Sequence, residues 1–572
     1  MAIIGIDLGT TNSLVTVYKD GKVTPIPNTF GEILTPSVVS FGENGEVYVG
    51  KIAKEMLITR PTETFSEFKR DMGSERTYRA GTRDYRPEEL SAFVLRRLKE
   101  DAERCLGEPV AEAVISVPAY FNDDKRCATK NAGRLAGLVV ERLINEPSAV
   151  ALKHHMDNNE MENFIIFDFG GGTLDVSLVE AFDNMVEIRA VAGDNYLGGK
   201  DFNEVIAREF YRENGLMQEL FDEKEQALVT KAAEQLKWEL TEKNQAECTV
   251  HLKGRDYPMR MENQRLIHCS VDLFKRMIQP IKKVLSDSGM GWDEIDRVIL
   301  AGGSSKMPIV WQYIKSICEA PVVVDEDPDT SIALGVGMAA AIKERTGDIR
   351  DMILADICPF SLGTAIYDGT FSPVIERNDT LPCSRRRTYY TASDYQTKMT
   401  FPIYQGENLI ADKNLLLGTM ELTDLPPAPR GMVSAEVTFL YDINGILDIR
   451  IESGNQSAHK LIFNKNIGLS EQELLAHIEE LKQQTLHPAD QEENRLLIER
   501  AERMYIECSG MVRERIAVFL RAFREALKGE QQQQIREAYV QLSLTLASIE
   551  QGQTVFEEFD ESFWQEDEET GE

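Results

Sequence analysis

This sequence has few cysteines, and they do not form pairs at short spacing. Its eight cysteines stand at positions 105, 127, 248, 269, 318, 358, 383 and 508, and none of them forms a C-x-x-C pair. The spacing therefore indicates neither a zinc site nor a dithiol redox motif. Cysteines that are few and scattered are typical of a reducing compartment.

Long apolar runs and an excess of basic charge are lacking as well. No run of about 20 apolar residues exists, so no membrane span is expected. The first residues enter a strand without a basic signal region, and we expect a cytoplasmic protein. The 572 residues carry a net charge of −32, which argues against nucleic acid or an anionic membrane as the main partner. Any bound nucleotide must then be held by backbone N–H groups, a metal ion and a few lysines.

Two stretches share one pattern of a strand, an aspartate, a glycine and threonine turn, and a second strand. Ile3–Val17 reads I-I-G-I-D-L-G-T-T-N-S-L-V-T-V, and Phe164–Val179 reads F-I-I-F-D-F-G-G-G-T-L-D-V-S-L-V. Glycines let backbone N–H groups approach an anion closely, and nearby carboxylates suit a hydrated Mg²⁺. One such hairpin is also compatible with an ordinary turn. Two copies favour a duplicated domain that grips a polyphosphate from both sides. Neither copy is a Walker loop or a dinucleotide fingerprint.

The first 345 or so residues alternate strands and helices, with glycines at four strand ends, which predicts an α/β fold with a ligand between two lobes. Pro87–Leu106 has helical apolar spacing, and a helix capped by Asn122 or Asp123 follows the expected strand Ala113–Val117. Phe202 to about Leu240 is also expected to be helical.

Several polar residues in this part allow two interpretations. Lys69 is by itself most simply a solvated surface lysine. Glu146 is either a partner for a helix dipole or a carboxylate aimed into a cleft. Glu234, Lys237 and Thr241 share one helix face, and such a stripe is usually a solvated face.

The composition changes after residue 345. We expect a linker over 346–359, a β-sandwich over 360–466, helices over 467–555 and a disordered acidic tail over 556–572. Turn signals stand at Asp20-Gly21, Asn44-Gly45, Asp368-Gly369, Gln405-Gly406 and Asn444-Gly445. Ser470 and Glu473 match a capping box, and breaks in the helices are expected near Pro488, Gly510 and Gly529.

Together these motifs resemble those of the DnaK-type heat-shock chaperones of the seventy-kilodalton class, and among them the HscC-like branch with a short lid. The resemblance rests on I-D-L-G-T-T-N-S at 6–13, F-D-F-G-G-G-T at 167–173 and V-I-L-A-G-G-S-S-K-M-P at 298–308. V-P-A-Y-F-N-D, I-N-E-P-S-A and G-D-N-Y-L-G-G-K-D-F also match, and the match covers roughly residues 1 to 500.

The resemblance implies an actin-like (ribonuclease H-like, duplicated) ATPase domain, a β-sandwich that binds peptides and a short α-helical lid. It implies slow hydrolysis of ATP with Mg²⁺ and K⁺, coupled through the apolar linker to binding and release of extended apolar segments of unfolded proteins. The implied partners are a J-domain co-chaperone and a nucleotide-exchange factor, and the chain is expected to be mainly a monomer.

The family pattern also assigns roles to individual residues. Catalysis falls to Lys69, Glu146, Asp168 and Thr173, and the metal to Asp7, Asp168 and Asp175. The nucleotide would contact Thr10, Thr11, Asn12, Gly170, Gly171, Gly172, Thr173, Gly198, Gly199, Glu234, Lys237, Thr241, Gly302, Gly303, Ser304, Ser305, Lys306 and Asp329. Peptide would contact Tyr367, Tyr389, Ala392, Met399, Phe401 and Ile446. Co-chaperone and allosteric contacts fall on Pro118, Tyr120, Asn122, Asp123, Arg142 and Asn145.

Two other functions are compatible with the glycine hairpins. A small-molecule kinase on the same actin-like fold would transfer phosphate to an acceptor, but sugar kinases carry no β-domain behind an apolar linker. A filament-forming actin relative would sediment in an ATP-dependent manner.

Overall fold

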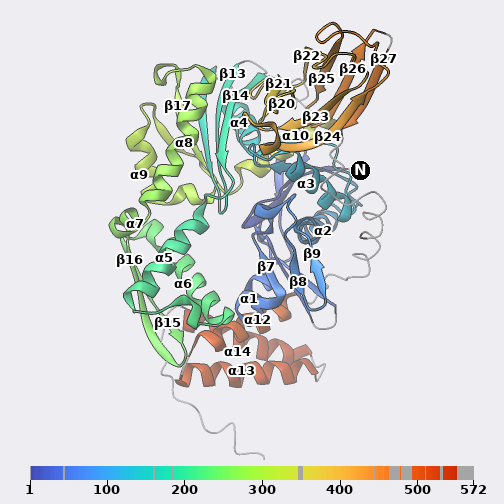
Figure 1. Cartoon of the computed structure of the whole chain (residues 1–572). Coiled ribbons are helices and arrows are strands. Elements are labelled where there is room, and N and C mark those ends of the chain that lie inside the picture. Colours follow the sequence, from blue (N-terminus) through green and yellow to red (C-terminus); the bar gives the residue numbers. More distant parts are fainter. Residues whose placement is uncertain are drawn as a thin grey trace, which may run out of the picture. The chain divides into compact units, whose positions relative to one another are not determined.

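The computed structural model describes residues 2–42, 45–158, 161–182, 185–344, 352–443, 445–454, 456–462, 477, 492–508, 510–528 and 532–550 (Figure 1). The chain divides into two compact units, 1–250 with 256–489, and 251–255 with 490–572. These borders differ from the domain boundaries expected at 345, 359, 466 and 555, which stay predictions.

A first sheet has the strand order β11-β10-β1-β2-β3, with β4 paired to β2. Its strands are β1 (Ile3–Asp7), β2 (Asn12–Lys19), β3 (Lys22–Ile26), β4 (Thr35–Pro36), β10 (Glu112–Val117) and β11 (Leu143–Asn145). The first hairpin is antiparallel, whereas β1 and β10 are parallel. The part of the chain built on this sheet is called lobe I below.

A second sheet, the basis of lobe II, repeats this arrangement in the order β18-β17-β12-β13-β14-β19. Its strands are β12 (Glu162–Phe169), β13 (Leu174–Phe182), β14 (Met185–Asp194), β17 (Arg297–Ala301), β18 (Val322–Val324) and β19 (Ile353–Ala355). Again the hairpin is antiparallel and a later strand joins in parallel. The repeated topology confirms that both glycine motifs are hairpins within similar sheets.

The helices of these lobes confirm most of the local expectations. They are α1 (Lys51–Thr59), α2 (Pro87–Leu106), α3 (Asp123–Leu135), α4 (Glu146–Asn158), α5 (Gly199–Glu213), α6 (Glu223–Glu242), α7 (Asn263–Cys269), α8 (Val271–Ser288), α9 (Pro308–Ile317) and α10 (Ser331–Glu344). Asn122 caps α3, since its side chain accepts a hydrogen bond from the Lys125 N–H. One expectation is wrong: α5 and α6 are separate helices, because the chain turns at Gly215, whose φ is 63°.

Short strands complete the two lobes. They are β5 (Val38–Phe41), β6 (Val47–Val49), β7 (Thr64–Ser66), β8 (Tyr78–Ala80), β9 (Arg83–Tyr85), β15 (Gln245–Leu252) and β16 (Arg255–Glu262). Small residues bring α4 and α10 together: a Cβ on Gly335 would lie 1.9 Å from the carbonyl oxygen of Ala149. This close approach explains the run of glycine and alanine in α10.

The β-only segment folds into two four-stranded sheets, β21-β20-β23-β24 and β22-β25-β26-β27. The strands are β20 (Leu362–Ala365), β21 (Phe371–Ile375), β22 (Cys383–Tyr390), β23 (Met399–Gln405), β24 (Leu415–Leu422), β25 (Ser434–Tyr441), β26 (Leu447–Ser453) and β27 (Gln456–Ile462). Burial alternates along β25 and β26, and the inward side chains of both sheets form one core. The expected sandwich is confirmed over the described residues.

Besides residues 251–255, the described part of the second unit consists of three helices, α12 (Glu492–Glu507), α13 (Gly510–Lys528) and α14 (Gln532–Glu550). Leu497, Phe523 and Leu542 belong to their shared core. The break expected near Gly510 is present, because α13 begins there at a φ of 58°. The capping box at Ser470 and Glu473, the breaks at Pro488 and Gly529, the tail, and Asn44 and Asn444 lie outside the described residues.

Candidate nucleotide site

The two hairpins bring three aspartates into the interior. Asp7 ends β1 and is 6% exposed, and the Ser116 hydroxyl donates a hydrogen bond of 2.6 Å to its Oδ1. Asp168 and Asp175 stand directly opposite each other in the β12–β13 pairing. The Tyr120 N–H donates to Asp175 Oδ1 at 3.1 Å. These carboxylates therefore come from both lobes.

The glycine turns of the hairpins face each other. A Cβ on Gly171 would lie 2.0 Å from Thr11 Oγ1, and a Cβ on Gly172 would lie 2.7 Å from Thr10 Cγ2. The loop before α5 closes on the same turn, since a Cβ on Gly198 would lie 2.4 Å from the backbone nitrogen of Gly172. Glycine thus allows the turns and the loop to approach one another closely, and at Gly198 a side chain would meet backbone atoms.

Lys69 and Glu146 form a buried ion pair beside these carboxylates. The Lys69 Nζ lies 2.6 Å from Glu146 Oε1, and their side chains are 5% and 7% exposed. The interpretation of Lys69 as a solvated surface residue is therefore wrong. Glu146 begins α4 with its carboxylate in the interior, so it is more than a partner for the helix dipole.

Burial and mutual repulsion perturb the acidic groups. Burial, and then the charge of Glu146, raise the pKa of Asp7 to about 6. The same two causes raise the pKa of Asp175 to about 7. Burial also raises the pKa of Asp168 well above its usual value, with further contributions from the neighbouring carboxylates. The protein thus gathers negative charge that a cation would neutralise.

A hydrated magnesium ion fits this set of residues. Asp168 Oδ2 is buried and has no hydrogen-bond partner among the described residues. Within the same described part of the chain, no three His, Cys, Asp or Glu side chains are placed to ligate a metal together. An ion held through water molecules needs fewer direct ligands, as Mg²⁺ commonly has in phosphate sites.

A second group of predicted residues lies next to the glycine turns. Lys237 is 8% exposed, and its Nζ donates to the carbonyl of Gly199 at 2.9 Å. Burial lowers its pKa to about 8, so the solvated-face interpretation is wrong for this residue. Lys306 Nζ lies 2.5 Å from Asp329 Oδ2, and a Cβ on Gly303 would lie 2.7 Å from Asp329 Oδ1.

The other residues predicted to enclose the nucleoside are placed as follows. Glu234 Oε1 lies 4.0 Å from the Nζ of Lys54 on α1, which joins the two lobes. Thr241 donates to the carbonyl of Trp238 within α6. A Cβ on Gly199 would lie 2.2 Å from Ser304 Oγ, and a Cβ on Gly302 would lie 2.6 Å from Asp168 Oδ1. Ser305 is fully buried. Asn12, which is predicted to contact the phosphates, begins β2.

Sequence reasoning missed Arg70. This residue follows Lys69 and is 9% exposed, and its Nε donates to the carbonyl of Gly172 at 2.9 Å. Its guanidinium also pairs with Asp201 at 3.2 Å, and Asp201 accepts from the Gly198 N–H at 2.7 Å. Arg70 therefore connects lobe I to both glycine loops of lobe II. A buried arginine of this kind gives no periodic signal in a sequence.

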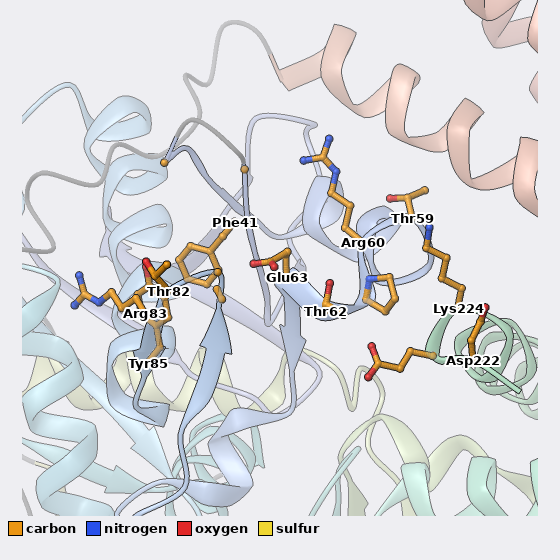
Figure 2. A pocket seen from close by; sticks show the side chains of 16 residues that line it. Phe41, Thr59, Arg60, Thr62, Glu63, Thr82, Arg83, Tyr85, Asp222 and Lys224 are labelled. Atoms are coloured by element: carbon orange, nitrogen blue, oxygen red, sulfur yellow. The ribbon is translucent and has the colours of Figure 1, made fainter. Parts of the chain in front are cut away.

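A separate cavity of about 1010 Å³ lies between the β5–β9 region and the start of α6 (Figure 2). Thr59, Arg60 and Glu63 line it from lobe I, and Asp222 and Lys224 line it from lobe II. It contains none of the predicted site residues. A smaller cavity includes Thr241 and Pro308.

The predicted allosteric residues lie against the linker and the β-sandwich. Asn145 Nδ2 donates a hydrogen bond of 2.7 Å to Asp356 Oδ2 of the linker. Burial lowers the pKa of neighbouring Arg142, and the negative charge of Asp356 partly offsets this decrease. The ring of Tyr120 lies 4.7 Å from that of Phe360.

The start of α3 contacts the sandwich directly. The Asp123 N–H donates to Gln405 Oε1 at 2.9 Å, and the Tyr441 hydroxyl donates to Asp123 Oδ1 at 2.8 Å. Neighbouring Pro118 is buried in lobe I, where its carbonyl accepts from the Phe121 N–H.

The peptide-contact candidates are not equally accessible. Tyr367 is 76% exposed and Ala392 is half-buried, whereas Met399 and Phe401 are buried in the sandwich core. Tyr389 is partly buried, with its ring 5.8 Å from that of Phe401. Ile446 follows the turn between β25 and β26, where its N–H donates to Asp442. In this conformation Met399 and Phe401 pack the core and are not placed to contact a peptide.

No helix in the described ranges has the length and apolarity to cross a membrane. A family model described as Hsp70 protein matches residues 3–569 of this chain, nearly its whole length. Members of that family are ATP-binding chaperones with an actin-like ATPase domain, a β-sandwich and a helical lid. With facing hairpins, a carboxylate cluster and a β-sandwich all present, the chain belongs to the Hsp70 family.

Proposed function

We propose that ATP hydrolysis between the two hairpins controls the binding of extended apolar peptides by the β-sandwich. The observation that supports this most is the position of the linker. Its strand β19 pairs in parallel with β14, in the sheet whose β12–β13 hairpin carries Asp168 and Asp175. The nucleotide site and the linker therefore share one sheet.

In the proposed reaction, the turns formed by Thr10 to Asn12 and Gly170 to Thr173 bind the phosphates of ATP through their backbone N–H groups. Lys69 contacts the γ-phosphate and the attacking water. Glu146, Asp168 and Thr173 orient that water for in-line attack. Asp7, Asp168 and Asp175 would hold Mg²⁺ through water, and the ion would neutralise phosphate charge. K⁺ ions are proposed nearby.

The nucleoside is proposed to lie against α6 and the loop after β17. On the α6 side it would contact Gly198, Gly199, Glu234, Lys237 and Thr241. The loop side supplies Gly302, Gly303, Ser304, Ser305, Lys306 and Asp329. Lys306 lacks the flat guanidinium that stacks on a base, so we expect weaker nucleotide binding than with arginine.

We expect the proposed hydrolysis to be slow, because no strong general base is expected to activate the attacking water. The carboxylate of Glu146 is already paired with Lys69 at 2.6 Å. Catalysis then rests on positioning and charge neutralisation. A slow step suits a timer for peptide binding.

Coupling is proposed to run through the linker and α3. Asp123 is bonded to Gln405 and Tyr441 of the sandwich, and Asn145 to Asp356 of the linker. A J-domain co-chaperone is proposed to act on this surface, and an exchange factor on the lobes. We propose a mainly monomeric, cytoplasmic protein of the HscC-like branch, with a lid formed by the C-terminal helices.

The test compares ATP hydrolysis with and without an unfolded apolar peptide, and peptide release with and without ATP. We expect peptide to raise the rate of phosphate release and ATP to speed peptide dissociation. Phosphate should appear without a phosphorylated acceptor, and ATP should cause no sedimentation. If peptide leaves the ATPase rate unchanged and ATP leaves peptide release unchanged, the proposed coupling is wrong.

A further inference from the structure

The edge strand β22 has an unusual run of side chains for so acidic a chain. Its sequence is C-S-R-R-R-T-Y-Y, and all three arginines are exposed. On one side β22 pairs with β25, and on the other side no described strand pairs with it. The backbone of an edge strand can accept an extended peptide as an additional strand.

One of these arginines has no acidic partner among the described residues. Arg385 pairs with Asp379 at 3.0 Å and Arg386 with Glu436 at 2.9 Å. Arg387 instead donates to the hydroxyl of Ser372 at 2.9 Å and to a carbonyl of β21. Its charge is therefore not compensated within the described part of the chain.

A second arginine without an acidic partner among the described residues is Arg430, which lies near the loop that carries Tyr367. Arg430 is exposed, and its guanidinium lies 5.8 Å from the centre of the Tyr367 ring. No described carboxylate forms an ion pair with it. The two nearby aspartates are engaged by backbone N–H groups: Asp368 accepts from Thr370, and Asp394 from Arg430 itself.

Aromatic side chains gather on the same loops. Tyr367, Tyr390 and Tyr395 are 76%, 62% and 71% exposed, and Met432 is 75% exposed. Arginines on an edge strand can simply prevent edge-to-edge aggregation. That explanation accounts for the arginines, but it does not explain why several large tyrosine side chains beside them are exposed.

We propose that the β22 edge and its flanking loops bind extended peptides in which acidic residues adjoin aromatic or aliphatic ones. The inference rests on the proposed chaperone function and names its substrate class. A strand laid along β22 would place acidic side chains near Arg385, Arg386 and Arg387. Its apolar side chains would meet Tyr390 and Tyr367 at the other end. Side chains alternate along such a strand, so both faces of β22 can contribute.

The experiment measures fluorescence anisotropy of three labelled peptides with the full chain. The peptides share one apolar core and carry glutamate, glutamine or lysine on both sides of it. We expect the glutamate peptide to bind about tenfold more tightly than the lysine peptide at about 50 mM salt. The difference should shrink at about 500 mM salt, where exposed charges are screened.

The double variant Arg387→Gln with Arg430→Gln should remove most of this preference. The control is Arg450→Gln, which removes one arginine charge away from the proposed site, on β26, where Arg450 is exposed and pairs with Asp448. The control should keep the preference, and circular dichroism should show that both variants fold. Equal binding of all three peptides, or a preference unchanged in the double variant, would overturn the inference. If the glutamine peptide still binds and ATP still releases it, the chaperone proposal survives that result. If none of the peptides binds, both fail.

Discussion

Replacing Lys69 with methionine is expected to destabilise the ATPase part far more than replacing its partner Glu146 with glutamine. The two side chains form a buried pair at 2.6 Å. Without Lys69, Glu146 remains close to three aspartates whose pKa values its charge raises. Without the charge of Glu146, Lys69 still has those aspartates as partners. Both variants therefore remove the same ion pair. Lys69→Met leaves a buried carboxylate among other carboxylates, whereas Glu146→Gln leaves a buried lysine among carboxylates.

The size of the effect follows from the burial of the pair. Removing one partner of a buried ion pair costs about 3–5 kcal/mol when the other is left uncompensated. Unfolding entropy is about 2 cal/mol/K per residue, or about 0.7 kcal/mol/K for a domain of about 345 residues. Lys69→Met should then lower Tm by about 4–7 °C. Glu146→Gln should lower it by about 1–2 °C, since about 1 kcal/mol is lost with a hydrogen bond to a neutral group.

The assay is scanning calorimetry of the full chain without nucleotide, at about pH 7.5 and about pH 5.5. At the lower pH, carboxyl groups with raised pKa values bind protons, so the penalty of Lys69→Met should shrink. Equal Tm values for both variants at the higher pH would refute the reasoning. So would a penalty for Lys69→Met that is the same at both pH values.

Three further predictions concern the same parts of the molecule. Gly198→Ala should weaken ATP binding more than tenfold by calorimetric titration, because its Cβ would lie 2.4 Å from the backbone nitrogen of Gly172. Tyr441→Phe removes a buried hydrogen bond of 2.8 Å to α3 and should weaken docking of the sandwich by about 1–3 kcal/mol, measured as slower ATP-triggered release of peptide. The pKa of Asp175 is raised to about 7 in the native state, so between about pH 4 and pH 7 the native state holds a proton on Asp175 that the unfolded chain has lost. The stability that this provides is complete below about pH 4 and is lost as the pH rises through 7, so Tm without nucleotide should fall between about pH 5 and 8, and Mg²⁺ should restore it.

Local signals predicted much of the fold correctly. The bounds of α2 match the expectation, since apolar spacing and Pro87 mark its start and Gly107 follows its end in the left-handed region. The Asn122 cap was equally readable, because its side chain acts within one turn of helix. The segment between α5 and α6 is the instructive failure: the chain leaves α5 after Glu213, turns at the left-handed Gly215 and enters α6 only at Glu223, and helical spacing on both sides concealed this break.

The contacts that assemble the site could not be read in this way. Arg70 bonds to Gly172 across 102 positions of sequence, and Ser116 bonds to Asp7 across 109. No periodicity predicts pairs so far apart. Local sequence favours a surface position for Lys69 for the same reason, because its partner Glu146 lies on a different element, 77 positions away. The family resemblance supplied what the local pattern lacked.

In the proposed coupling, strand β14 connects the nucleotide site to the linker strand. At one end of this strand Gly193 pairs with Asp175, and at the other Met185 to Glu187 pair with the linker strand. The linker contributes only three paired residues there, and Ile353 is 58% exposed. At about 0.5–1.5 kcal/mol per hydrogen bond, such an attachment is worth a few kcal/mol. Coupling free energies between sites are typically about 1–3 kcal/mol, so a nucleotide that shifts β14 can supply enough to release the linker. In the proposed coupling, a longer or better buried linker strand would need a larger free-energy change at the nucleotide to be released.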